Sequence, residues 1–393
     1  MKRIYLDHIA CTPLRAEVVE AMLPYLQTHF GNAQSLHQEG QLAAQAMEEA
    51  RVKVAALINA QPAEIYFTSS GSEANNFALK GMALARKDKG RHLIISAIEH
   101  QSILHSAKFL EKLGFEVTQV PVDRFGQVDP EDVRRALRPE TVVVSIMLAN
   151  SEVGTIQPVK EIVSLCQERG IPVHTDAVAA VGNIVVDVKD LGVDALSLAG
   201  HQFYGPKGAA ALYLKKGTRI LPLIDGGIQE GGRRAGTEDV AAIVGLGRAA
   251  EIARQEMKSW AENLQPLRDY LIQELPSRIP HVILTGHPER RLPHHASFCV
   301  EFIEGEAMLL NLDLKGFAAS SGSACTSRAL KASHVLLAMG LDHATAQGSI
   351  VFSLINGTTR EDIDELLEVF PPIVDRLRKM SPLYTQFLEG KKQ

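Results

Sequence analysis

Between about residues 60 and 215, short apolar runs alternate with longer amphipathic runs, and this alternation limits the possible folds more than any other feature of the chain. The amphipathic runs begin near residues 72 and 101 and have the length of helices. The apolar runs have the length of strands and cover residues 64–68, 92–96, 142–148, 172–175, 195–198 and 210–214. Strands that alternate with helices form a mainly parallel, helix-covered sheet, and ligands gather at the carboxyl ends of its strands. We therefore predict an α/β fold.

The pattern changes after about residue 240. A long helical stretch from residue 237 to about 275 leads into a shorter segment of mixed helices and strands. Strands are predicted there at residues 281–284, 296–301 and 350–353. We therefore predict a large domain from residue 15 to 250 and a smaller α+β domain made of residues 1–14 and 251–393.

The charge balance argues against nucleic acid as the main partner. The formal net charge of the 393 residues is −5, and no dense run of lysine or arginine precedes the Lys391-Lys392 tail. No stretch reaches the roughly 18 apolar residues that a membrane helix needs, and the first residues lack the apolar core of a signal peptide. We expect a cytoplasmic protein, without a membrane partner, that acts on a small molecule or another protein.

Polar side chains stand where several predicted strands end. Ser72 opens a helix and would add a hydroxyl donor to an anion site there, although an ordinary serine N-cap explains it equally well. Asp176 could pair with a heteroaromatic nitrogen or serve as a cap or salt-bridge partner. His100 could stack on a ring or be a partly buried surface histidine, and Asn150 begins another loop. Their joint position at consecutive strand ends predicts one shared ligand site.

The four cysteines have different settings. Cys325 lies in a run of small residues from 319 to 327, so we expect an accessible thiol and a candidate nucleophile. Cys166 and Cys299 lie within predicted core elements, and Cys11 in the N-terminal arm is expected to be a packing thiol. The spacing of the four predicts no disulfide framework.

A pair of adjacent histidines is the one sequence feature that suggests a metal. His294 and His295 lie on a predicted strand, where neighbouring side chains point to opposite faces of the sheet. Such a pair binds one ion poorly without a further ligand. We therefore predict no metal site.

Taken together, these segments resemble the cysteine desulfurases, homodimeric pyridoxal-phosphate (PLP) enzymes of the class V aminotransferase fold that supply sulfur for iron–sulfur clusters. The likeness extends over essentially the whole chain, in order and at the family's spacing. It implies the seven-stranded sheet of PLP fold type I. The matching segments are residues 5–7, 31–37, 71–76, 99–100, 154–158, 174–177, 204–208, 233–238, 321–325 and 333–336.

The resemblance also implies roles for single residues. The cofactor phosphate would bind Ser72 together with Thr237 of the partner subunit, His100 would stack on the ring, Asp176 would pair with the pyridine nitrogen, and Cys325 would carry the sulfur as a persulfide. The resemblance thus makes His100 and Cys325 the catalytic candidates. The cofactor-binding positions that it implies are Ser72, Asn150, Asp176, His201, Gln202 and Thr237.

Position 202 departs from the family pattern. The family has its Schiff-base lysine there, whereas this chain has Gln202, and a carboxamide nitrogen cannot form a Schiff base because its lone pair is delocalised. Lys207 belongs to the following Gly-Pro-Lys-Gly turn and is not a displaced replacement. Three more family contacts are absent, a ring-oxygen glutamine, a phosphate-binding serine and a substrate-carboxylate arginine, at the positions of Ala179, Ala199 and Asn356. The arginine contact alone is worth about 1.5–3 kcal/mol.

Four losses in one pocket favour natural divergence over a single engineered change. Our first hypothesis is a protein that no longer removes sulfur from free cysteine through PLP. It would instead serve sulfur transfer or iron–sulfur cluster assembly through Cys325, by accepting a persulfide or by lending a thiolate to a cluster on a scaffold protein. Any PLP would be held non-covalently. Three alternatives stay open: an active desulfurase seen as a lysine-to-glutamine variant, a pseudoenzyme that binds or regulates a partner, and a pocket that takes a different small molecule.

Overall fold

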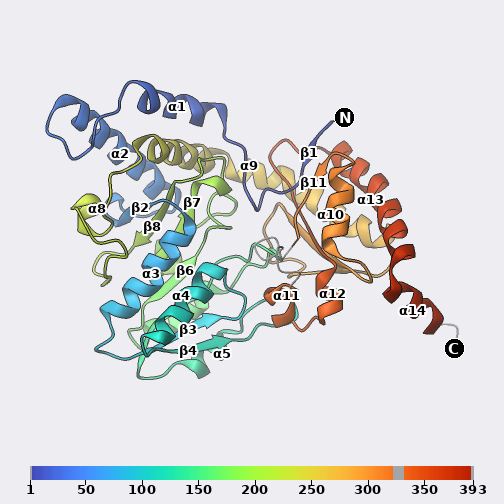
Figure 1. The fold of residues 1–393 in the computed structure, drawn as a ribbon. Coiled ribbons are helices and arrows are strands. Elements are labelled where there is room, and N and C mark those ends of the chain that lie inside the picture. Colours follow the sequence, from blue (N-terminus) through green and yellow to red (C-terminus); the bar gives the residue numbers. More distant parts are fainter. Residues whose placement is uncertain (1, 322–331, 391–393) are drawn as a thin grey trace.

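The computed structural model describes residues 2–321 and 332–390, and its largest element is a seven-stranded sheet (Figure 1). The strand order is β2-β8-β7-β6-β5-β3-β4. The pairings are parallel except around β8, which runs antiparallel to both β2 and β7. The strands are β2 Ile65–Thr68, β3 His92–Ser96, β4 Glu116–Val120, β5 Thr141–Ser145, β6 Val173–Asp176, β7 Ala195–Ala199 and β8 Ala210–Leu214. The predicted α/β fold with a mainly parallel sheet is confirmed.

Helices cover both faces of this sheet because its strands are apolar on both sides. In β3, Leu93 and Ile95 pack into one cluster with α3 and α4, while Ile94 packs into the opposite cluster with α2, α6 and α9. This is the alternation of side chains that a β-strand imposes. The helices are α1 Ala16–Gln27, α2 Gln38–Leu57, α3 Gly71–Ala85, α4 Gln101–Lys112, α5 Pro130–Ala136, α6 Val159–Gln167, α7 Val188–Leu191 and α9 Val240–Arg278.

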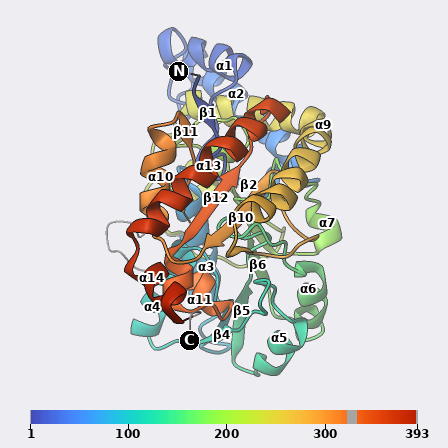
Figure 2. The ribbon, with the colours of Figure 1, turned by 90° about the vertical axis from the view of Figure 1, so that its right-hand side faces the viewer.

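The C-terminal part has a sheet of its own, with the antiparallel order β12-β10-β9 (Figure 2). The N-terminal strand β1 (Ile4–Tyr5) joins this part by pairing with β11 (Phe317–Ala318). Other elements are η1 Pro62–Glu64, η2 Gly200–Gln202, α8 Gln229–Gly232, β9 Val282–Leu284, β10 His295–Val300, α10 Gly305–Asp313, α11 His334–Ala338, α12 His343–Gln347, β12 Ser349–Ser353, α13 Arg360–Met380 and α14 Pro382–Gly390.

Helix α9 contributes to two separate hydrophobic cores. Leu246 and Ile252 in its first half pack with the seven-stranded sheet, whereas Leu264 and Leu271 pack with β10, β12 and α13. The core changes within one turn after Trp260, which still belongs to the first core. The domain boundaries at residues 14/15 and 250/251 remain a prediction.

The sequence-based expectations differ from the structure in a few places. Strand β4 was not predicted, because Glu116 and Gln119 are exposed and the strand lies at the sheet edge, where the apolar pattern is weak. The glycine-rich stretch around residue 230 forms the short helix α8, in which Glu230 has a left-handed backbone with φ of 48°. Cys166 and Cys299 are fully buried, as predicted. No helix in the two described ranges is long and apolar enough to cross a membrane.

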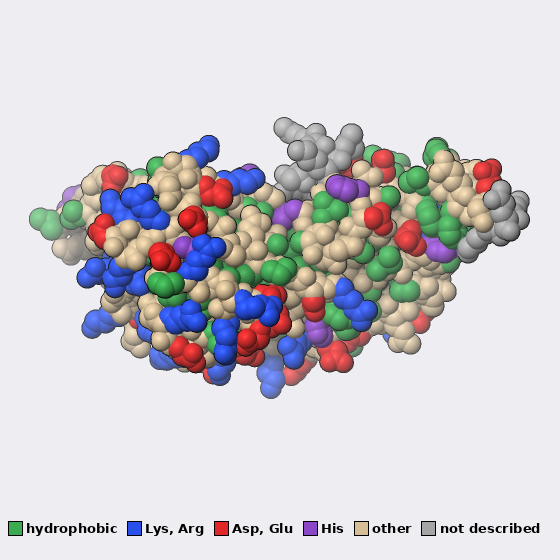
Figure 3. Space-filling model, turned by 90° about the horizontal axis from the view of Figure 1, so that it is seen from below, with side chains coloured by type: hydrophobic (Ala, Val, Ile, Leu, Met, Phe, Trp, Pro, Cys, Tyr) green, Lys and Arg blue, Asp and Glu red, His purple; other side chains and the backbone are tan. Residues whose placement is uncertain are grey.

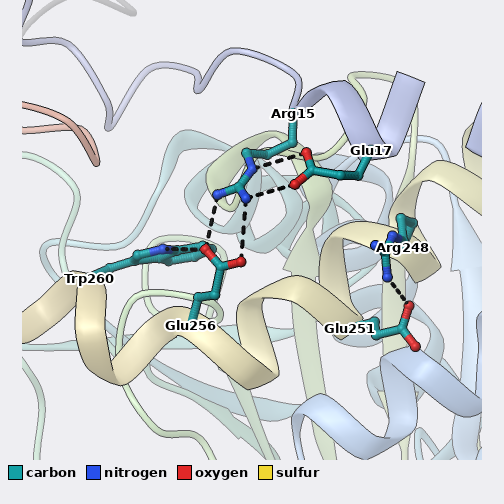
Figure 4. A network of polar contacts seen from close by, with 6 residues as sticks. All are labelled: Arg15, Glu17, Arg248, Glu251, Glu256 and Trp260. Carbon is teal, nitrogen blue, oxygen red and sulfur yellow. Dashed lines mark hydrogen bonds and ion pairs between the residues drawn. The ribbon is translucent and has the colours of Figure 1, made fainter. Parts of the chain in front are cut away.

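Partly exposed polar side chains fasten the N-terminal arm to α9 (Figure 4). The guanidinium of Arg15 donates to Glu17 at 2.9 Å and to Glu256 on α9 at 3.0 Å. Trp260 Nε1 donates to the same Glu256 carboxylate at 3.1 Å. Each such contact is worth about 1 kcal/mol or less because water screens it. These contacts therefore orient the arm along α9 and add little to the free energy of folding.

A buried ion pair between Arg51 and Glu230 ties α2 to α8. Both Nη atoms of Arg51 donate to the Glu230 carboxylate at 2.8 Å, and the side chains are 11% and 2% exposed. Glu230 also accepts a hydrogen bond from the backbone N–H of Phe67 in β2 at 2.8 Å. The carboxylate thus joins three segments at the edge of the large sheet.

We expect Arg51→Met to destabilise the protein by about 3–5 kcal/mol, because it leaves the Glu230 carboxylate buried without a counter-charge. The free energy of unfolding, measured by denaturant titration, checks this value. The double variant Arg51→Met/Glu230→Met should recover much of the loss, since no charge then stays buried. Equal losses in the single and double variants would contradict the proposed charge effect.

Candidate functional site

A cavity of about 610 Å³ opens beside the carboxyl ends of β3 and β5. Its walls come from four parts of the sequence: the N-terminal arm, the residues after β3, the loop after β5 and the C-terminal part. Lysine and arginine side chains are interspersed with acidic ones over the face shown in Figure 3. The lining includes Ile9, Ala10, Ile98, Glu99, His100, Gln101, His105, Met147, Asn150, Ser151, Glu152, Ser320, Ser321, Ala332, Ser333, His334, Val335 and Val351.

A chain of hydrogen bonds joins His100 to Asp176. His100 caps α4, and its Nδ1 accepts from the backbone N–H of Ser102 at 3.2 Å. The Ser102 hydroxyl lies 2.7 Å from the same Nδ1, and Asn75 donates to Ser102 Oγ at 2.9 Å and to Asp176 Oδ2 at 2.6 Å. With Nδ1 as the acceptor, the ring proton of neutral His100 lies on Nε2. The sequence did not single out Asn75 or Ser102 for this role.

Asp176 and Asn150, two of the candidates predicted at strand ends, have different hydrogen-bond partners. Asp176 is 6% exposed, and its Oδ1 accepts from the backbone N–H of Val178 at 3.0 Å. Asn150 is buried; its Oδ1 accepts from the N–H groups of Glu152 and Val153, and its Nδ2 donates to the Ile98 carbonyl. Asn150 therefore shapes the loop that walls the cavity.

Ser72 and Thr237 lie away from the cavity lining. The N-cap of α3 is Ser70, whose hydroxyl accepts from the Glu73 N–H at 3.1 Å, so the capping alternative applies to Ser70 and not to Ser72. Ser72 is exposed in the first turn of the helix. Thr237 is also exposed, just before α9. Both hydroxyls are therefore open to a ligand or a second protein chain.

Gln202 is bonded to the N-terminal arm. Its side chain is buried at 4% exposure, and Nε2 donates to the Ile9 carbonyl at 2.7 Å. Its Oε1 has no hydrogen-bond partner among the described residues. The preceding residue, His201, is half-buried, and its carbonyl accepts from both the N–H and the hydroxyl of Thr12 at 2.8 Å. The arm thus runs directly over position 202.

These residues do not fit a PLP group held through a Schiff base. Asp176, His100 and Ser72 could contact a ring and a phosphate, but Gln202 has no amine, and no lysine lines the cavity among the described residues. The backbone N–H of Asn356 donates to the Tyr204 hydroxyl at 2.8 Å, and its side chain carries no charge for a substrate carboxylate. Ala179 and Ala199 are buried and offer no polar side-chain atom.

Two carboxyl groups in the cavity wall escaped the sequence analysis. Glu99 is fully buried, its Oε1 accepts from Ser96 Oγ at 2.6 Å and from the Met147 N–H at 2.9 Å, and burial raises its pKa to about 8. Glu152 accepts from the hydroxyl of Ser333, and burial raises its pKa to about 7. The position of Glu99, at a strand end directly before His100, was a usable signal. Glu152 had none beyond its place in a loop.

Cys325 lies outside the described residues. The nearest described residues on either side, Ser321 and Ala332, both line the cavity. Cys11 is half-buried, with its Sγ 3.3 Å from the Thr12 carbonyl, and it is not part of the lining. Of the predicted site residues, the cavity thus brings together His100 and Asn150, while hydrogen bonds through Ser102 and Asn75 connect Asp176.

Comparisons with known proteins agree with this architecture. The model of the family "Aminotransferase class-V" matches residues 4–366. The chain is 51% identical to "Cysteine desulfurase IscS" of Methanosarcina thermophila, with 97% of this chain and 94% of that one covered. It is also 51% identical to the protein of the same name from Dictyoglomus turgidum, over 100% of both chains.

A solved structure is similar over nearly the same length. The "NifS-like protein" superposes with a TM-score of 0.90 at 37% identity, covering 95% of this chain and all of the other. The sequence matches and the shared fold extend beyond the cavity to both hydrophobic cores. This chain belongs to the cysteine desulfurase family of the class V aminotransferases.

Proposed function

We propose that this protein serves sulfur transfer or iron–sulfur cluster assembly through Cys325, without forming a Schiff base with PLP. The observation that carries the proposal is the hydrogen bond from Gln202 Nε2 to the Ile9 carbonyl at 2.7 Å. This bond ties the side chain at position 202 to the N-terminal arm, and position 202 is where the resemblance expects a catalytic lysine. Removal of sulfur from free cysteine through a covalent PLP adduct is therefore not the activity that this pocket favours.

The family relationship and the place of the cysteine segment support the sulfur role. The relatives named above are cysteine desulfurases, and the residues flanking the segment of Cys325 line the cavity. Accepting a persulfide or ligating a cluster needs an exposed thiolate and no aldimine. Both roles suit a protein that works beside a scaffold or sulfur-acceptor protein in the cytoplasm.

The same residues also determine how PLP would be held. His100, Asp176 and Ser72 could still contact PLP, but without the covalent bond and without polar side chains at positions 179 and 199 the affinity should fall by several kcal/mol. We therefore propose that PLP, if it binds, binds reversibly.

We expect the protein expressed from its unmodified gene to carry no PLP on any lysine after borohydride reduction and to release no sulfide from L-cysteine. Peptide mass mapping and a sulfide assay check both points. The variant Gln202→Lys should gain a reducible adduct. Its kcat/KM should stay about tenfold to a hundredfold below that of Gln202→Lys/Asn356→Arg, because the carboxylate clamp is absent. An adduct on any lysine of the unmodified protein, Lys207 included, would favour the active-desulfurase alternative.

A persulfide assay tests the role of Cys325. After incubation with a low-molecular-weight persulfide, the Cys325 thiolate should take the outer sulfur as the donor's S–S bond breaks and the donor leaves as a thiol. The peptide with Cys325 should then carry one added sulfur, and Cys325→Ser should lose it. Cys11→Ser is the matched control and should keep the added sulfur; its loss would show that the second thiol takes part in the transfer. If Cys325→Ser also supports iron–sulfur cluster assembly as well as the unmodified protein does, the thiol role is wrong and the pseudoenzyme alternative stands.

We also propose a homodimer that uses the face around the α1–α2 loop. Phe30 and Leu36 in this loop are 84% and 91% exposed, and Ile228 next to α8 is 76% exposed. The contact of Gln34 with Glu238 at 3.3 Å places the loop beside the segment of Thr237. Exposed apolar side chains of this size favour a protein interface.

We expect Phe30→Asp/Leu36→Asp to convert the dimer into a monomer, because two charges would then be buried in the interface. Light scattering coupled to size-exclusion chromatography measures the mass. Val185→Asp is the control, since Val185 is 80% exposed but lies in another loop. A dimer that tolerates the double substitution would exclude this face as the interface.

A further inference from the structure

We propose that a second pocket, at the end of the large sheet opposite the cavity, binds a small molecule with a diphosphate group. This basic pocket has a volume of about 660 Å³, and its lining residues fall between Arg86 and Arg219, a range that the structure describes in full. Small-molecule sites have volumes of roughly 300–1,000 Å³. Its occupancy depends neither on Cys325 nor on position 202, so it goes beyond the proposed function.

The basic pocket lies at the amino ends of β6 and β7. Pro172 and Asp194 directly precede these two strands, and Lys215 directly follows β8, which runs antiparallel to β7. The backbone N–H of Lys215 donates to the Asp194 carbonyl at 2.9 Å and fastens the turn after β8 to this end of the sheet. The cavity lies at the carboxyl ends of β3 and β5, which run parallel to β6. A ligand in the basic pocket would therefore lie outside the cavity.

The lining of the basic pocket is strongly cationic. It has five basic side chains and one acid, Asp194, although the whole chain has a formal net charge of −5. None of the five forms an ion pair with a described residue. Neighbouring cations repel one another, and a multivalent anion would relieve that repulsion. The five are Arg86, Lys89, Lys215, Lys216 and Arg219.

The Arg86 guanidinium is fixed in the wall of the pocket. Its Nη2 donates to the Gly170 carbonyl at 3.0 Å. Burial lowers the pKa of Arg86, Asp194 offsets part of this effect, and the positive charge of Arg219 adds to it. An anion in the pocket would favour the charged form of this guanidinium. Lys89, Lys215, Lys216 and Arg219 are exposed and can contact the anion directly.

The ends of two helices explain only part of this positive charge. Cations at a helix C-terminus are stabilised by the helix dipole. Arg86 is the C-cap of α3 and bonds to Gly170, which follows α6, so the dipoles account for its position. Lys215, Lys216 and Arg219 come from the turn after β8 instead. The helix dipoles do not account for these three side chains.

The acids near the pocket are already engaged by backbone groups. Asp194 Oδ2 accepts from the N–H of Val173 at 2.9 Å, and burial raises the pKa of this carboxyl group. Glu64 lies outside the lining, and its two oxygens accept from the N–H groups of Lys216 at 2.9 Å and Gln61 at 3.0 Å. An incoming anion would therefore displace no carboxylate from the lining cations.

A diphosphate group matches the basic pocket in charge and in hydrogen bonding. With Asp194 ionised, the lining keeps a net formal charge of four. A single phosphate group carries at most about two negative charges, so two linked phosphates approach this value more closely. Guanidinium and ammonium groups both donate charge-assisted hydrogen bonds to phosphate oxygens.

Calorimetric titration with pyrophosphate and with phosphate tests the charge requirement. At about 0.15 M salt, where long-range attraction is screened, we expect pyrophosphate to bind about tenfold more tightly than phosphate, because one further charged hydrogen bond is worth about that factor. Equal binding of the two anions, or binding of neither, would overturn the proposal. The titration involves no sulfur chemistry, so its failure would leave the proposed role of Cys325 untouched.

Variants locate the bound pyrophosphate. Lys215→Gln and Arg219→Gln should each weaken its binding about tenfold, and both side chains are exposed, so the fold should tolerate the changes. Arg134→Gln is the charge-matched control on α5, where Arg134 pairs with Glu131 at 3.3 Å, and it should bind pyrophosphate unchanged. Ser72→Ala should also bind it unchanged, which separates the basic pocket from the position expected for the cofactor phosphate. Unchanged binding in both pocket variants, or an equal loss in Arg134→Gln, would overturn the assignment.

Discussion

Hydrogen bonds between the N-terminal arm and the loop after β7 connect the core of the seven-stranded sheet with the core of the C-terminal part. Thr12 exchanges bonds with His201 and Tyr204, and Gln202 donates to Ile9. His8 is buried between the Gln202 and Leu354 carbonyls at 3.0 Å from each, so it touches both parts of the chain. Because Ile9 and Ala10 also wall the cavity, the shape of the site depends on the same bonds that join the cores. Gln202 therefore helps to hold the N-terminal arm, at the position where the resemblance expects the Schiff-base lysine.

Much of the large sheet was predictable because its strands are buried on both faces. Residues 92–96 and 210–214 were predicted with their observed boundaries, since continuous apolar runs between polar turns leave little choice. Edge strand β4 gave no such signal, and its partner β3 fixes it through pairing that a single sequence does not display. Tertiary contacts decide such elements.

The site was predictable only in part, for a related reason. Strand ends pointed to His100, Asn150 and Asp176, but the link through Asn75 and Ser102 depends on how α3 and α4 pack side by side. Glu99 and Glu152 become informative through burial, which changes the charge state of an otherwise ordinary acid.

Helix α9 belongs to both cores, and this has a thermodynamic consequence. Its 39 residues span about 60 Å, and neither half can lose its partner without exposing apolar side chains on the same continuous helix. Separate unfolding of the C-terminal part would leave Leu264 and Leu271 in water while Leu246 stayed packed. The two cores should therefore unfold together, because they share this helix.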